Sequence, residues 1–120
     1  MNIIFGDAVN QVSNTHTILE IDTFKLMPSG QLVKTYCVIN SVPLAEFPRL
    51  DANKHIHQQL IEQYQQQNWE FCRSALHSLT GCWNGEMDTF YQHLADRIDE
   101  HATNPLDENW DYTITREQTV

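Results

Sequence analysis

Three side chains in the last third of the chain are of types that bind divalent metals. His93, Asp96 and Glu100 lie three and four residues apart in a segment with helical periodicity. Because a helix turns once in about 3.6 residues, this spacing places the imidazole and the carboxylates on one face. The alternative is a solvated face of ion pairs, because a zinc site also needs further ligands and a second shell. The three residues are metal candidates, but we expect no metal or other cofactor.

No side chain has the surroundings that activate a nucleophile. The serines lack the flanking glycines of a nucleophile elbow, and Gly6 lacks the second glycine and the lysine of a phosphate loop. Cys37, Cys72 and Cys82 form no CxxC motif, and none is set in the helix N-terminal or basic context that lowers a thiol pKa. We therefore predict no catalytic residue and three reduced, unmetallated thiols.

Two tryptophans fall outside the helical periodicity. Trp83 lies in the connector 81–85, between glycines, and Trp110 lies in an acidic C-terminal segment. Tryptophans are enriched among the residues that dominate binding at protein interfaces, so both are candidate partner-binding residues. A connector tryptophan can also fold back and fill the space between two helices. For Trp83 we predict this inward arrangement.

The first half of the chain has the composition of strands. Residues 17–26 and 32–40 are rich in β-branched and aromatic residues, and Pro28 and Gly30 between them are typical of a turn. This pattern predicts a β-hairpin over 17–40. With the short apolar run at 3–5, it predicts a small antiparallel sheet over residues 3–40. Pro43 and Pro48 then disfavour both helix and central strand.

The second half predicts three amphipathic helices over about 52–102. The apolar stripes are Ile56, Leu60, Ile61 and Tyr64; then Trp69, Cys72, Leu76 and Leu79; then Met87, Phe90, Tyr91, Leu94 and Ile98. Asp51 suits an N-cap, and Gly81 suits the left-handed position after a helix. The fold class is α+β, with the sheet packed against the helices. We expect one domain over 1–103, with a β-rich half at 1–50 and a helical half at 51–103, and an acidic tail at 104–120.

The charge balance excludes some partners. The 120 residues include 16 acids and 7 bases, which give a formal net charge of −9. Binding to nucleic acid or to an anionic membrane surface requires a basic stripe, and the sequence has none. The N-terminal run has no basic leader, and no segment approaches the roughly 20 apolar residues of a membrane span. We expect a cytoplasmic protein that binds neither nucleic acid nor membrane.

Several short motifs recur in one known family. They are Phe5-Gly6-Asp7-Ala8-Val9-Asn10, the run from Met27 to Tyr36, and the segments 64–69, 90–97 and 105–111. In this order they resemble the C-terminal end and the helical tail of bacterial class III adenylate cyclases. The resemblance implies the shape of a cyclase tail. It does not imply cyclase activity, because Ile3 and Asn14 stand where those enzymes carry a base-recognising aspartate and an arginine, and only Asn10 matches.

The leading functional hypothesis is a non-enzymatic interaction or regulatory module. Its partner is another protein or a second copy of this chain, because an exposed hairpin edge or a connector tryptophan favours a symmetric dimer. The alternative is a small enzyme or ligand-binding protein with a pocket between sheet and helices. A carboxylate or histidine with a strongly shifted pKa in a cleft would favour the alternative, whereas an exposed apolar patch would favour the module.

Overall fold

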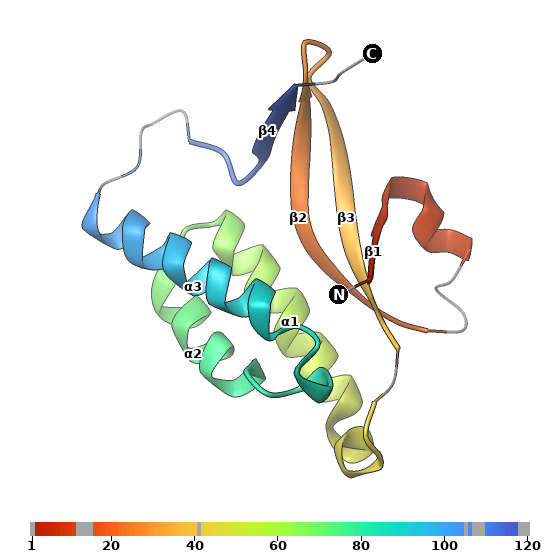
Figure 1. Cartoon of the computed structure of the whole chain (residues 1–120). Coiled ribbons are helices and arrows are strands. Elements are labelled where there is room, and N and C mark those ends of the chain that lie inside the picture. Colours follow the sequence, from red (N-terminus) through yellow and green to blue (C-terminus); the bar gives the residue numbers. More distant parts are fainter. Residues whose placement is uncertain (1, 12–15, 41, 105, 107–109, 118–120) are drawn as a thin grey trace. The chain divides into compact units, whose positions relative to one another are not determined.

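A computed structural model describes residues 2–11, 16–40, 42–104, 106 and 110–117 (Figure 1). The chain is α+β, as the sequence predicts, and it forms two compact units. The strand unit comprises residues 1–40 and 112–120, and the helical unit comprises residues 41–111. The β-rich part therefore ends near residue 40, and the predicted tail contributes to both units.

The strand unit contains one four-stranded sheet. Its strands are β1 (Asn2–Phe5), β2 (Thr17–Met27), β3 (Gln31–Ile39) and β4 (Ile114–Glu117), in the order β1-β3-β2-β4. β3 pairs antiparallel with β1 and β2, whereas β4 pairs parallel with β2. The sheet is therefore mixed, which differs from the purely antiparallel sheet that the sequence predicts. The fourth strand comes from the segment predicted as an acidic tail.

The β2–β3 hairpin is confirmed, and its turn uses the predicted residues. The N–H group of Gly30 donates to the Leu26 carbonyl at 2.7 Å, and Gly30 has a φ of +77° that favours glycine. Pairing slips by one residue between Glu20, opposite Tyr36, and Thr23, opposite Lys34. This bulge places buried Thr23 on the same side of the sheet as Lys34, since directly opposed residues share a face.

The helical unit contains the three predicted helices and two 3₁₀ segments that precede or join them. They are η2 (Leu44–Arg49), α1 (Leu50–Gln65), α2 (Trp69–Leu79), η3 (Trp83–Gly85) and α3 (Asp88–Thr103). In the strand unit, η1 (Gly6–Gln11) is a further 3₁₀ segment directly after β1. Of the helices among the described residues, none has the length and apolar character needed to cross a bilayer.

The helix ends agree with the sequence prediction at Gly81 and differ at Asp51. Gly81 has a φ of +88° after α2. The N-cap of α2 is Asn68, which was not among the predicted caps, and its side-chain oxygen accepts from the Phe71 N–H at 3.4 Å. Asp51 is not the N-cap of α1, because η2 continues directly into that helix, which begins at Leu50. Asp51 instead lies in the first turn of α1, where its carboxylate interacts favourably with the helix dipole.

The core of the helical unit follows the predicted apolar stripes, except that the buried face of α1 is shifted by one residue. The buried side chains of α1 are His57, Leu60, Ile61 and Tyr64, so His57 takes the buried position predicted for Ile56. The apolar core is completed by Cys72, Ala75, Leu76, Leu79, Trp83, Met87, Phe90, Tyr91, Leu94 and Ile98. All three cysteines are free thiols, and Cys37 and Cys72 are fully buried.

Candidate functional site

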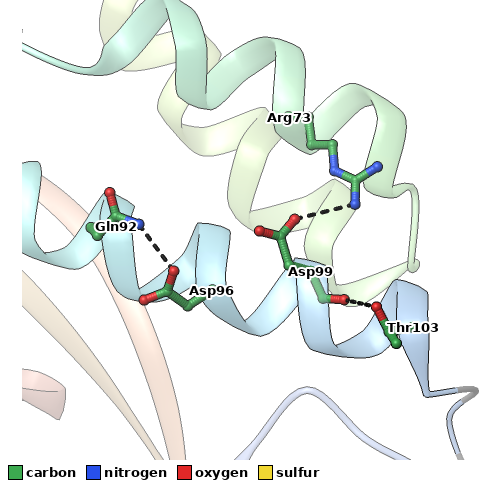
Figure 2. A network of polar contacts seen from close by, with 5 residues as sticks. All are labelled: Arg73, Gln92, Asp96, Asp99 and Thr103. Atoms are coloured by element: carbon green, nitrogen blue, oxygen red, sulfur yellow. Dashed lines mark hydrogen bonds and ion pairs between the residues drawn. The ribbon is translucent and has the colours of Figure 1, made fainter.

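The metal candidates lie on the exposed surface of α3. His93, Asp96 and Glu100 are all exposed, and Asp96 accepts a hydrogen bond from the Gln92 side chain at 3.0 Å (Figure 2). On the same helix, Asp99 forms an ion pair with Arg73 of α2 at 3.3 Å. Across the described residues, no three His, Cys, Asp or Glu side chains gather closely enough to hold a metal ion. This surface has the ion pairs and hydrogen bonds of a solvated helix face.

Trp83 is directed inward. Its side chain is only 1% exposed, and its Nε1–H donates to the Tyr91 hydroxyl at 2.9 Å. Its backbone N–H donates to Glu46 Oε1 at 3.0 Å. Trp83 and Asn84 both have left-handed φ values, +59° and +55°, at this turn between α2 and α3. The inward alternative for this residue is therefore the one observed, and in this arrangement the indole presents no surface to a partner.

A buried hydrogen-bonded triad connects Trp83 to α1 and α3. His57 is 1% exposed, and its Nδ1 lies 2.9 Å from the hydroxyl of Tyr91, which also accepts from Trp83. The Tyr91 hydroxyl therefore accepts from the Trp83 indole and shares a second hydrogen bond with Nδ1 of His57. Because its three side chains are buried, the triad cannot contact a substrate. It links α1, the connector at Trp83 and α3. The buried position of His57 is not among the sequence predictions, although its spacing from Leu60 and Ile61 places it on the apolar stripe.

Trp110 belongs to a second cluster, of four aromatic rings. It packs edge-on against Tyr64, Trp69 and His101, with ring centroids 5.9, 6.1 and 5.4 Å away. The Tyr64 hydroxyl and His101 Nε2 are 3.4 Å apart. Burial lowers the pKa of His101, an effect that Glu100 opposes and Arg97 reinforces. Trp69 and Trp110 are both half-buried, so this cluster holds Trp110 against the ends of the helices and leaves part of each indole exposed.

A polar cleft of about 560 Å³ lies on one side of the sheet in the strand unit. Asp7 and Asn10 of η1, Lys34 and Tyr36 of β3, and Tyr112 contribute to its walls. Lys34 is 3.7 Å from the carboxylate of Glu20. The charge of the cleft is therefore set by one cation, Lys34, and two acids, Asp7 and Glu20. Asn10, the one functional residue that this chain shares with the cyclases it resembles, therefore lines a cleft with hydrogen-bonding side chains.

An apolar hollow of about 390 Å³ occupies the opposite side of the same sheet. Its walls are Phe5 of β1, Phe24 and Leu26 of β2, and Val33 of β3. Arg116 of β4 also lines it, with its guanidinium carbon 5.6 Å from the centroid of the Phe24 ring. Phe5 is 58% exposed and is continuous with Ile3 on the same face of β1, which is 43% exposed. We call this surface, Ile3 with the walls of the hollow, the apolar face.

The functional assignment depends on these side chains alone. No protein-family model matches this chain, and neither a curated protein nor a solved structure does. Sequence reasoning could not have found the apolar face, because exposed and buried strand residues of the same type cannot be told apart by composition.

Proposed function

We propose that this protein is a non-enzymatic interaction module that binds a protein partner through the strand unit. The observation that carries the proposal is the apolar face, where Phe5 is more than half exposed beside a hollow lined by apolar side chains. Exposed apolar side chains that gather around a hollow mark interaction sites more often than scattered ones do. An aromatic or aliphatic side chain of the partner would fill the hollow. The Arg116 guanidinium, which also lines the hollow, favours a carboxylate beside that side chain.

The distribution of charge supports the same surface. The strand unit has four acidic and three basic residues, so its formal charge is −1, whereas the helical unit has twelve acids and four bases and a formal charge of −8. The cores of protein interfaces are depleted of charged residues. The strand unit therefore has the composition of an interface, and the helical unit has that of a solvated surface.

The chemistry of the buried groups favours binding over catalysis. Burial raises the pKa of the Cys72 thiol to about 11, so the thiol stays protonated and unreactive at neutral pH. His57, the most buried histidine, is held by Tyr91 inside the core. A general acid or base must reach a substrate, and neither group lies in a cleft among the described pockets.

The proposal is tested by capture with matched variants. The full chain is compared with Phe5→Asp, which adds a charge to the apolar face, and with Leu44→Asp, which adds the same charge at a 79% exposed position of the helical unit. Circular dichroism first verifies that both variants fold. We expect a partner that the wild type and Leu44→Asp retain and that Phe5→Asp loses, with affinity for the purified partner reduced roughly 30-fold or more. Equal capture by all three proteins would overturn the proposal.

The polar cleft supports a second candidate function, the binding of a small polar ligand. Its volume falls within the range of ligand sites, and Asn10, Lys34 and Tyr36 offer donors and acceptors from separate elements. A thermal-shift screen of small anions and amides would test it. A true ligand raises the melting temperature of the wild type but not that of Asn10→Ala or Lys34→Ala. A panel that stabilises all three proteins equally, or none, contradicts this candidate.

A further inference from the structure

β1 is an edge strand with unusual chemistry for that position. It pairs with β3 on one side only, and no other strand of the described residues lies along its second edge (Figure 1). Such an edge presents unpaired backbone N–H and C=O groups, and proteins usually protect it with charged side chains or proline. β1 reads Asn-Ile-Ile-Phe, with no charge and no proline, whereas the other edge strand, β4, includes Arg116 and Glu117. The two edges of this sheet are therefore unequally protected.

The charge distribution favours a second copy of the chain at this edge. Two molecules carry −9 each, so most approaches between them are repulsive. The strand unit has a formal charge of only −1 and the helical unit has −8, so contact through strand units brings together the least charged surfaces. A basic partner of another kind could equally bind the acidic helical unit. A second copy has only the strand unit as a nearly neutral surface.

We infer that the protein forms a symmetric dimer by antiparallel pairing of β1 with β1 of a second copy, which makes one continuous eight-stranded sheet. This inference rests on the proposed function and names the partner of the strand unit. A two-fold axis perpendicular to the sheet keeps both apolar faces on the same side. Residues directly opposed across the axis must then belong to the same face.

The symmetry selects one register. When Ile4 opposes Ile4 of the partner subunit, Ile3 opposes Phe5 of the partner subunit and Phe5 opposes the partner subunit's Ile3. This register covers both exposed side chains of β1 with apolar cross-strand neighbours. A register centred on Ile3 would leave Phe5 beyond the paired residues, so the pairing centred on Ile4 is the one that the exposed residues favour.

The oligomeric state tests the dimer. Light scattering after size exclusion, over a wide range of protein concentration, should give a dimer mass for the wild type and a mass that falls toward the monomer on dilution. Ile3→Lys should raise the dimer dissociation constant at least about ten-fold, because two cross-strand pairs are lost per dimer. Leu32→Lys is the matched control, since Leu32 is 53% exposed in the same unit but lies on β3. Mixing Ile3→Lys with Phe5→Glu should restore a heterodimer, in which the two new charges are opposed.

Cross-linking tests the register. In a Cys82→Ser background, Ile4→Cys places two thiols on opposed residues, whose Cα atoms are about 4.5–5.5 Å apart in antiparallel pairs and so within reach of a disulfide. We expect Ile4→Cys to form a covalent dimer under mild oxidation and Leu32→Cys to remain monomeric. Equal cross-linking of both variants would overturn the register.

The outcomes separate this inference from the proposed function. A wild type that stays monomeric at every concentration overturns the dimer, while capture of a foreign protein that depends on Phe5 would keep the proposed function. A dimer that Ile3→Lys and Leu32→Lys weaken equally places the interface elsewhere and also overturns the inference. A monomer with no Phe5-dependent capture overturns both.

Discussion

Removing the indole of Trp83 should destabilise the helical unit more than any change at its surface. Trp83 is the largest of the fully buried side chains, and Trp83→Ala would leave a cavity among Tyr91 and its neighbours. Large-to-small changes of an aromatic residue in a core cost about 3–5 kcal/mol. The Tyr91 hydroxyl also loses a donor, although His57 Nδ1 remains beside it at 2.9 Å. Because alanine at φ +59° keeps the backbone strain of this position, no compensating gain is expected.

The loss of packing and the loss of the hydrogen bond can be measured separately. Trp83→Phe keeps most of the ring volume but removes the Nε1–H, and we expect it to cost about 1–2 kcal/mol. Tyr91→Phe removes the oxygen that both Trp83 and His57 contact, so two buried polar groups each lose a hydrogen-bond partner. We expect this to lower the free energy of unfolding by about 1–3 kcal/mol. Since these residues share one network, the double variant should cost less than the sum of the two single changes.

Urea unfolding followed by far-ultraviolet circular dichroism measures these changes without relying on the fluorescence of the tryptophan that is removed. Leu44→Ala, at a 79% exposed position, is the control and should change the free energy of unfolding by no more than about 0.5 kcal/mol. A free energy of unfolding for Trp83→Ala within about 1 kcal/mol of the parent would refute the argument that this indole closes the core.

Three further predictions follow from individual side chains. Because the folded pKa of His101 is lowered by burial, folding favours the neutral ring, so stability is complete above the unfolded pKa and falls as pH drops below it. The urea midpoint of the wild type should therefore fall more between neutral and mildly acidic pH than that of His101→Phe; equal falls would contradict this. In the native protein, alkylation read by mass spectrometry should modify only half-buried Cys82, and slowly, because burial, followed by Glu46 and Asp88, raises its pKa. Three thiols should react after unfolding, and early modification of Cys37 or Cys72 would be inconsistent with their burial. The purified protein should form no cyclic nucleotide from a nucleoside triphosphate with Mg²⁺ or Mn²⁺, because Asn10 is the one side chain required for cyclase activity that the sequence retains; measurable product would refute this.

The elements with local signals were predictable from the sequence. The β2–β3 hairpin follows from β-branched runs on either side of Pro28 and Gly30, and the three helices follow from apolar residues at helical spacing. β4 was missed because a strand of four residues, Ile-Thr-Arg-Glu, has too little alternation to recognise. Its stabilising contacts, Ile114 beside Phe24 and Arg116 over the Phe24 ring, come from a strand roughly 90 residues earlier. The bulge after Glu20 was missed for the same reason, since only pairing with β3 defines it.

Of the buried triad, the position of Trp83 was predictable from the sequence and that of His57 was not. The inward position of Trp83 could be predicted because a helical unit of this size has little other large apolar volume to close its end. His57 was missed because a histidine counts as polar in a periodicity search, and its burial is acceptable only where Tyr91, 34 residues away, supplies a hydrogen-bond partner.

Recognising the apolar face requires both the sequence and the strand order of the sheet. The sequence places Ile3 and Phe5 in an apolar run that could equally have been a buried strand. The strand order decides otherwise, because it puts β1 at an edge and leaves these two side chains exposed. The charge count then becomes informative, since the same chain that concentrates its acids in the helical unit keeps this edge uncharged. An edge strand without charge or proline is a liability unless something pairs with it. In the dimer that we propose, β1 of the second copy would pair with this edge.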